Sequence, residues 1–353
     1  MPPAKKMMTM RDLAKIAGVN HSTVSLALRH SVRVAPRTRQ KILRLAEQHG
    51  YVMNPLISAC MTFRKRVHAN PHAHSTLAFL VNYPPGISWR HDSLPLNYNG
   101  ALHQAESHGY RLEEFLIPSR LTAQRVCQIL QARNIHGVIV APLYPDGKAQ
   151  LDFLWEKFCA VAIGLSLKEP HLYHVAHDYY HGMRLALSEC RKRGLRRPGF
   201  VSLESTNKRL GSNWMAAYLL EQQSYSPSDR LRPFVLKGNA LDVRALRQWA
   251  ASERPDSILS LQMVWPETER WKEIVAGLPG PVEWISLDVK NRGDDQAGIY
   301  QNHEKVGAAA ADLLIRLVEI NQPGALECSE TLLIEGAWIE GKRQGRVRPS
   351  PAD

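Results

Sequence analysis

From Thr76 onward, short apolar runs alternate with segments whose apolar residues have helical spacing, and this rhythm strongly constrains the fold. The strand-like runs are "TLAFLVN", "YRLEEFLI", "GVIVAP" and "CAVAIGL", then "LYHVAHD", "GFVSLE", "PFVLKG", "SILSLQ" and "VEWISLDV". Between them we expect helices near 97–109, 122–133, 149–158, 179–193, 208–223, 241–252 and 267–276. Strands bounded by helices in this order predict parallel sheets with right-handed crossovers. The two consecutive sets predict two α/β subdomains.

The end of this region repeats the same pattern once more. The run "AGIYQNHEKVGAAAADLLIRLVEI" predicts a strand, a turn and a long helix, and "ETLLIEG" predicts a further strand. In open parallel sheets, ligands bind beyond the carboxyl ends of the strands. Residues that directly follow the predicted strands are therefore the candidates for a binding site.

The positive charge of the chain is concentrated before this region. The 353 residues carry a net charge of +12. Residues 1–74 hold thirteen Lys or Arg and only two acids, Asp12 and Glu47, a net charge of +11. A concentrated basic segment is typical of proteins that bind a polyanion such as nucleic acid.

The basic segment has the pattern of a small folded domain. Three helices are expected over about 10–17, 21–29 and 36–49, each with an apolar stripe. Gly18 suits the end of the first helix, and Asn20 suits the N-cap of the second. Two helices joined by so tight a turn predict a helix-turn-helix.

A further short helix is expected after Tyr51, in "NPLISACMTFRKR". It begins with Asn54 and Pro55 and ends with three cations, Arg64–Lys65–Arg66. A helix this short is unstable alone in water. We expect it to fold only against a partner surface, ahead of the linker "VHANPHAHS".

The run "TMRDLAKIAGVNHSTVSLALRHSVRVAPRTRQKILRLAEQHGYVMNP" resembles the headpiece of the LacI/GalR family of transcription regulators. The resemblance includes D-x-A-x-x-A-G-V, S-T-V-S, the T-R-x-x-I helix and the G-Y-x-x-N-P exit. It implies that the second helix enters the major groove of DNA. It also implies a hinge helix that pairs with that of its dimer mate in the minor groove, where a leucine wedges open the central base step.

The resemblance implies a set of DNA contacts. The segment 21–29 departs from some well-studied members in carrying Leu26 where they have an arginine. Leucine cannot make the bidentate contact to guanine, but it can pack on a thymine methyl group. The wedge leucine aligns with Cys60, and Met61 is next to it, so either side chain is a candidate wedge, and a packed, buried thiol is the alternative for Cys60. The implied base-reading positions are His21, Ser22 and Leu26; those near phosphates are Thr23, Ser25 and Arg29; and those of the hinge are Asn54, Pro55, Ser58, Ala59, Cys60 and Met61. Apart from the resemblance, Arg33 is expected to supply positive charge for the DNA backbone.

The rest of the chain resembles the periplasmic-binding-protein-like core of the same family. The expected fold class is therefore α/β, with an all-α headpiece and hinge before two parallel-sheet subdomains. The resemblance implies that the chain crosses between subdomains near 167, 292 and 326. The expected domains are 1–53 (headpiece), 54–75 (hinge helix and linker), 76–345 (core, with 76–167 and 293–325 in one subdomain and 168–292 and 326–345 in the other) and 346–353 (tail).

A small-molecule effector is expected in the cleft of this core. Asp288, in "SLDV", aligns with an acid that binds sugar hydroxyls in many members, and Arg209 lies near the polar ligand clamp. An acid, an arginine and a tryptophan suit a sugar, because they offer charged hydrogen bonds and a stacking face. The candidate cleft residues are Asn82, Trp89, Pro142, Leu143, Ser166, Asp178, Arg209, Trp214, Gln262, Asp288 and Gln301.

The run "HLYHVAHDYYH" offers an alternative chemistry, a metal site. His177 and His181 have the i, i+4 spacing of a helical ligand pair, and His171, His174 and Asp178 are close in sequence. However, the segment crosses a predicted strand-to-helix junction, so these side chains cannot share one face. We therefore expect surface histidines or a cleft contact in this run, with no metal and no other cofactor.

Other functional classes have little support in the sequence. It has no nucleophile elbow, P-loop, G-x-G-x-x-G or H-E-x-x-H, so we expect no enzyme activity. Five scattered cysteines, no apolar run of about 18 residues and no signal-peptide pattern favour the cytoplasm and exclude a membrane partner. The expectation is a homodimeric regulator, with a repressor favoured, that binds a pseudo-palindromic double-stranded operator under control of a sugar-like effector. The alternative is a sugar-binding protein or sugar-metabolising enzyme fused to a DNA-binding module.

Overall fold

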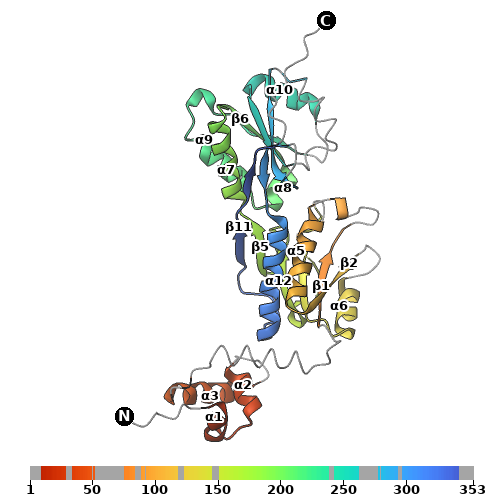
Figure 1. Ribbon diagram of the computed structural model, residues 1–353, viewed down its shortest axis with the longest axis vertical. Coiled ribbons are helices and arrows are strands. Elements are labelled where there is room, and N and C mark those ends of the chain that lie inside the picture. Colours follow the sequence, from red (N-terminus) through yellow and green to blue (C-terminus); the bar gives the residue numbers. More distant parts are fainter. Residues whose placement is uncertain are drawn as a thin grey trace. The chain divides into compact units, whose positions relative to one another are not determined.

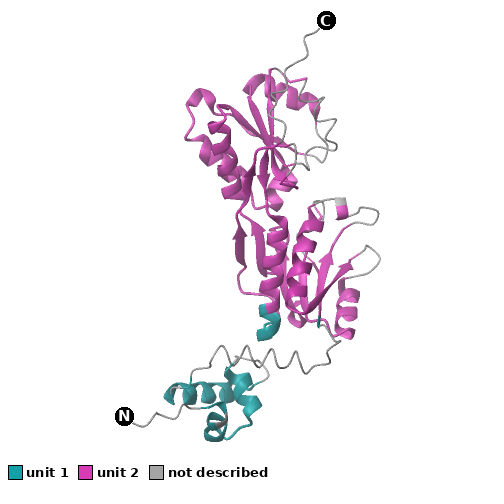
Figure 2. Cartoon of the chain, viewed as in Figure 1, with its two compact units in different colours: residues 1–75, 316–322 teal, residues 76–315, 323–353 magenta. Residues whose placement is uncertain are grey.

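The computed structural model describes residues 9–28, 34–49, 51, 75–83, 89–91, 93–117, 123–144, 151–237, 242–261, 277–278, 280–292 and 296–341. The chain divides into two compact units, residues 1–75 with 316–322 and residues 76–315 with 323–353 (Figure 2). The first unit contains the headpiece, and the second contains the core.

The headpiece consists of α1 (Met10–Ala17), α2 (His21–Leu28) and α3 (Pro36–Gln48), as expected (Figure 1). Thr9 caps α1: its hydroxyl oxygen accepts a hydrogen bond from the Asp12 N–H at 3.2 Å. Gly18 ends the helix in the left-handed region, with φ 69°. Side chains from all three helices form one fully buried core of Leu13, Val24, Ala27 and Ile42.

The first subdomain of the core is a six-stranded sheet with three helices. The strand order is β11-β5-β4-β3-β1-β2, and the pairs for which a register is defined are parallel. Its elements are β1 (Ser75–Val81), β2 (Tyr110–Leu116), β3 (Gly137–Val140), β4 (Cys159–Ile163), β5 (Tyr173–His177), β11 (Glu330–Ile334), α5 (Leu94–Ser107), α6 (Ala123–Ala132), α12 (His303–Ile320) and the short helices Trp89–His91 and Trp155–Lys157.

The second subdomain is also a six-stranded sheet, in the order β12-β10-β9-β8-β6-β7. All its defined pairs are parallel except β10 with β12. Its elements are β6 (Pro198–Leu203), β7 (Phe234–Leu236), β8 (Ser257–Ser260), β9 (Glu283–Val289), β10 (Gly298–Tyr300), β12 (Ala337–Ile339), α7 (Tyr179–Lys192), α8 (Glu204–Arg209), α9 (Asn213–Gln222), α10 (Val243–Glu253) and the short helix Pro227–Asp229. The strand β12 was not expected from the sequence.

Helices α5 and α12 of the first subdomain lie side by side (Figure 1). They meet at two glycines: a Cβ at Gly100 would overlap the backbone of Glu304, and a Cβ at Gly307 would overlap that of Asn97. The amide of Asn97 also donates a hydrogen bond to the His303 carbonyl at 2.9 Å. The beginning of α12 is thereby fixed to the first subdomain. In the part of the chain that the structure describes, neither α12 nor any other helix is long and apolar enough to cross a membrane.

The chain changes sheet later than we expected. Both β5 and β11 pair within the first sheet, whereas residues 168–177 and 326–334 were expected in the other subdomain. The crossings follow residues 177, 300 and 334 rather than lying near 167, 292 and 326. The reason is that β5 pairs with β4, the strand that precedes it, so the chain completes a fifth strand of the first sheet before it leaves that sheet.

Two helix predictions were wrong in detail. Of the helix expected over 149–158, only Trp155–Lys157 is helical among the described residues 151–158. Leu151, Phe153 and Trp155 are buried while the residues between them are exposed, and this period of two is that of extended chain. The helix expected over 208–223 is divided into α8 and α9 by Gly211 and Ser212, which both have positive φ. The helix expected over 267–276 lies outside the described residues.

Candidate functional site

The headpiece presents an almost uncharged helix face on a basic domain. Val24 and Ala27 of α2 are buried in the core, whereas His21, Ser22 and Leu26 are exposed, Leu26 by 36%. Thr23 and Ser25 lie between, half-buried. The predicted contacts Arg29, Arg33, Asn54, Pro55, Ser58, Ala59, Cys60 and Met61 lie outside the described residues.

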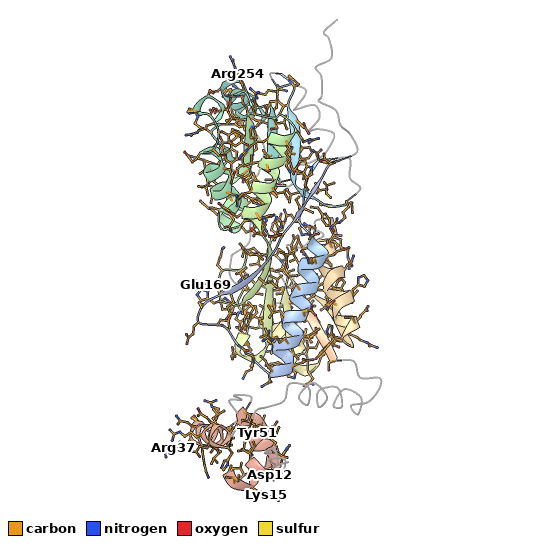
Figure 3. All side chains as sticks on the ribbon, turned by 60° about the vertical axis from the view of Figure 1, so that its left-hand side comes forward. Asp12, Lys15, Arg37, Tyr51, Glu169 and Arg254 are labelled. Carbon is orange, nitrogen blue, oxygen red and sulfur yellow. The ribbon has the colours of Figure 1, made fainter. Side chains whose placement is uncertain are left out.

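Cations lie on the other helices of the headpiece. Arg37, Lys41 and Arg44 of α3 border a shallow groove together with uncharged polar residues and Leu45. The amine of Lys41 donates a hydrogen bond to the Ala17 carbonyl at 3.0 Å, so it ties α3 to the end of α1. Arg37 and Lys15 lie on different sides of the domain (Figure 3). Cations of α1 and α3 therefore accompany the uncharged exposed side chains of α2 in the same domain.

The core contains a cavity of about 80 Å³ between its two subdomains. Its walls come from the segments that follow β1, β3, β4 and β5 of the first sheet and β6, β8, β9 and β10 of the second, and from α5, α7 and α12. This is the carboxyl-end position at which open α/β sheets bind ligands. The lining residues are Tyr83, Ser93, Leu94, Asn97, Pro142, Ile163, Gly164, Leu165, Ser166, Ala176, His177, Tyr179, Arg209, Leu210, Leu261, Asp288, Gln301, His303 and Val306.

An ion pair lies in the wall of this cavity. The Nε2 atom of His303 is 2.7 Å from Oδ1 of Asp288, and both side chains are largely buried. An ionised carboxylate only accepts hydrogen bonds, so the imidazole N–H donates. Burial by itself raises the pKa of the Asp288 carboxyl, but the charge and hydrogen bond of His303, with Lys290, outweigh it and hold that pKa below its usual value. Asp288 is therefore a carboxylate at neutral pH.

His177 is a second buried histidine beside the cavity. Its Nδ1 atom lies 3.2 Å from the Ile334 carbonyl oxygen and donates to it. Its ring packs against Tyr179 and Trp214, with centroid distances of 5.3 and 5.7 Å. Burial, with a smaller contribution from His303, lowers the pKa of His177 to about 4. The ring is therefore neutral at pH 7, and Nε2 is an acceptor that has no hydrogen-bond partner among the described residues.

Polar contacts with the backbone shape the rest of the wall. The guanidinium of Arg209 donates to the Leu143 carbonyl at 3.2 Å, and the Leu143 N–H donates to the Ser166 hydroxyl oxygen at 2.8 Å. The amide of Gln301 donates to the Leu287 carbonyl at 2.7 Å. Arg209 thus extends from α8 of the second subdomain to the loop after β3 of the first.

The candidate residues from the sequence are only partly brought together. Ser166, Arg209, Asp288 and Gln301, with Pro142, line the cavity. The others do not: Leu143 lies behind Arg209, Trp214 is buried behind His177, Trp89 packs on Phe79 and Tyr98, Asp178 caps α7, Asn82 is half-buried after β1, and Gln262 lies outside the described residues.

Sequence reasoning missed several lining residues, including Tyr83, Asn97, Tyr179 and His303. His177, the last residue of β5, lines the cavity, and the sequence alone did not single it out among the histidines of its run. His174 and His177 lie on opposite faces of β5, because side chains alternate along a strand. His174 hydrogen-bonds the Gly164 carbonyl at 2.8 Å. Within the described ranges, no group of three His, Cys, Asp or Glu is placed to hold a metal ion.

Comparison with known proteins identifies the headpiece. Residues 9–54 match the model of the family described as bacterial regulatory proteins, lacI family. The probable HTH-type transcriptional repressor ExuR of Bacillus subtilis (strain 168) is 50% identical over 48 residues, 14% of this chain and 14% of that protein. The HTH-type transcriptional regulator GalR of Lacticaseibacillus casei is 30% identical over 151 residues, 40% of this chain and 38% of that protein. The matches thus span less than two fifths of either relative.

The fold is shared over nearly the whole chain. A structure of the transcriptional regulator CelR in complex with cellobiose is 19% identical with a TM-score of 0.55, and covers 97% of this chain and 99% of that one. A structure of the lac repressor dimer bound to operator and the anti-inducer ONPF is 15% identical with a TM-score of 0.51, and covers 95% of this chain and 98% of that one. Residues 9–54 are therefore a headpiece of the lacI family, and the two-subdomain core shares the fold of these transcriptional regulators.

Proposed function

We propose that the protein is a homodimeric, sequence-specific DNA-binding regulator, favoured to be a repressor, whose operator affinity is controlled by a small molecule bound in the core cavity. The observation that carries the proposal is the headpiece. A folded helix-turn-helix that matches the family over 9–54 presents His21, Ser22 and Leu26 on one exposed face. A regulator of this kind requires no catalysis, and we propose that the protein acts in the cytoplasm.

A sugar is the proposed effector class. The relatives in the comparisons include a regulator in complex with cellobiose and the lac repressor with the anti-inducer ONPF. In this chain, Asp288 and Arg209 border the cavity as a carboxylate and a guanidinium, with the hydroxyls of Tyr83, Ser93 and Tyr179 nearby. Charged groups of both signs and hydroxyls suit a ligand rich in hydroxyl groups.

Selection of random DNA duplexes by the full chain tests the proposed DNA binding. We expect enrichment of a pseudo-palindrome, and we expect affinity for it to fall about a thousandfold between 50 and 200 mM salt if about six phosphates are neutralised. Electrophoretic mobility shifts at a series of salt concentrations measure this. A selection that enriches no sequence at low salt contradicts the proposal.

A pair of variants tests the helix face within the same selection. Leu26→Arg should shift the preferred base pair from one bearing a thymine methyl toward guanine, because arginine bonds guanine in the major groove. Ile16→Ala is the matched control, since Ile16 is a similarly exposed aliphatic side chain on α1. An unchanged preference in Leu26→Arg removes Leu26 from the base-reading face.

The proposed effector site is tested by thermal shift. In a screen of sugars against the full chain, we expect at least one that raises the melting temperature of the wild type, since a ligand that binds only the native state stabilises it. At a concentration of about 100 times Kd the gain is about 2.7 kcal/mol. Asp288→Asn should lose this shift and still bind the selected DNA. A full shift in Asp288→Asn would exclude Asp288 from the site.

A further inference from the structure

The ion pair in the cavity wall joins two parts of the core that have separate anchors. Asp288 belongs to β9 of the second sheet, and its N–H donates to the Ser286 hydroxyl oxygen at 3.1 Å. His303 is the first residue of α12, and the Asn97 amide of α5 holds its carbonyl at 2.9 Å. The contact of 2.7 Å between the two side chains therefore connects the second subdomain to the first across the cavity.

A second contact crosses the same cavity. Arg209 of α8 donates to the Leu143 carbonyl after β3 at 3.2 Å. This contact ends on a backbone oxygen, which keeps its partial charge in every state. The Asp288–His303 contact joins two ionisable side chains that are only 13% and 11% exposed. Removing one member of such a buried pair leaves the other charge without compensation.

We propose that His303 is the positioning residue of the effector site and the latch between its two subdomains. Through its N–H it fixes Oδ1 of Asp288 and leaves Oδ2 as the oxygen that accepts a donor from the effector. Because the same hydrogen bond joins the subdomains, the position of the effector's acceptor and the closure of the cleft are set by one contact. The inference rests on the proposed function, because that proposal identifies the cavity as the effector site.

Hydrogen exchange of the full chain, without DNA or sugar, tests the latch. We expect His303→Leu to accelerate amide exchange at least about tenfold in peptides that border the cavity, 141–144 and 206–212, and to leave peptides from β6 unchanged. His303→Gln keeps an N–H donor near the same position and should restore protection to within about threefold of the wild type. Equal exchange in His303→Leu and wild type overturns the proposal, as does failure of His303→Gln to restore protection.

A cycle with Asp288→Asn separates positioning from general support of the fold. If His303 acts through Asp288, His303→Leu adds no further acceleration in the Asp288→Asn background. Additive effects overturn the proposal. If His303→Leu proves unstable, His303→Ala, which also lacks the N–H donor, replaces it in the cycle. The matched control is His108→Leu, since His108 forms an exposed pair with Asp312, at 3.9 Å, within the first subdomain. If the exchange experiments contradict the latch, the result of the DNA selection still stands. If the DNA selection fails, the exchange experiments still test the latch.

Discussion

Replacing Gly307 by alanine should destabilise the core by about 3 kcal/mol or more, although alanine is the better helix former. Helix propensity alone favours alanine by about 1 kcal/mol in the interior of a helix such as α12. A Cβ at this position, however, would overlap the Asn97 carbonyl oxygen and lie 3.0 Å from the Ala101 nitrogen. Overpacking costs about 1–3 kcal/mol where side chains can adjust, and here only the backbone of α5 can move. Steric exclusion therefore outweighs propensity.

Urea unfolding followed by circular dichroism measures this loss. Lys305→Ala is the matched control, because Lys305 is an exposed residue on the same helix, and we expect its substitution to change the free energy of unfolding by less than about 0.5 kcal/mol. Gly100→Ala tests the contact from the other side, since its Cβ would overlap the Glu304 carbonyl oxygen. A Gly307→Ala variant as stable as the wild type would show that α5 and α12 separate without cost. His303, one turn before Gly307, would then have no fixed position.

The order of strands and helices was predictable because burial on both faces of a parallel sheet produces apolar runs that read clearly in sequence. The pairing of the strands was less predictable, since it depends on contacts between distant segments. β11 pairs with β5 over Glu330–Ile334 and Tyr173–His177, and neither run indicates by itself which sheet it joins. The crossings were consequently placed too early. Buried and exposed residues alternate over 151–155 in the structure, a pattern of extended chain, yet from the sequence we predicted a helix there.

In the cavity, too, residues recognisable from their own segment were predictable, whereas contacts between distant segments were not. Asp288 was predictable from its place near the end of a strand and from the family resemblance, and the structure places it in the cavity wall. Its partner His303 was not, because the two side chains meet only when α12 is packed on α5 and β9 lies in the second sheet. Trp214 was expected to offer a stacking face to ligand, but it is 2% exposed and packs on His177 and Tyr179. An apolar aromatic residue near a strand end fits a core as well as a cleft.

Acidification should lower the unfolding free energy of the wild type more than that of a variant without the His177 ring. The folded-state pKa of about 4 lies below the ordinary value of 6.5, so the unfolded chain binds a proton first as the pH falls. The stabilising contribution of neutral His177 is complete above pH 6.5 and is lost progressively between pH 6.5 and 4. Over the interval from pH 7.5 to 4.5, this corresponds to about 2–3 kcal/mol of unfolding free energy.

His177→Asn should remove that part of the pH dependence. Asparagine does not titrate, and its amide can still donate to the Ile334 carbonyl in place of Nδ1. Urea unfolding at pH 7.5 and 4.5, followed by tryptophan fluorescence, gives the difference for each protein, and every other titrating group contributes to both. His136→Asn is the control, since His136 is an exposed histidine of the first subdomain, and it should keep the wild-type slope. If His177→Asn keeps that slope as well, the fold does not lower the pKa of His177, and the ring is protonated within the fold below about pH 6.5. In that pH range the Nε2 atom beside the cavity would be a donor, and the cavity wall would carry a positive charge next to the Asp288–His303 pair.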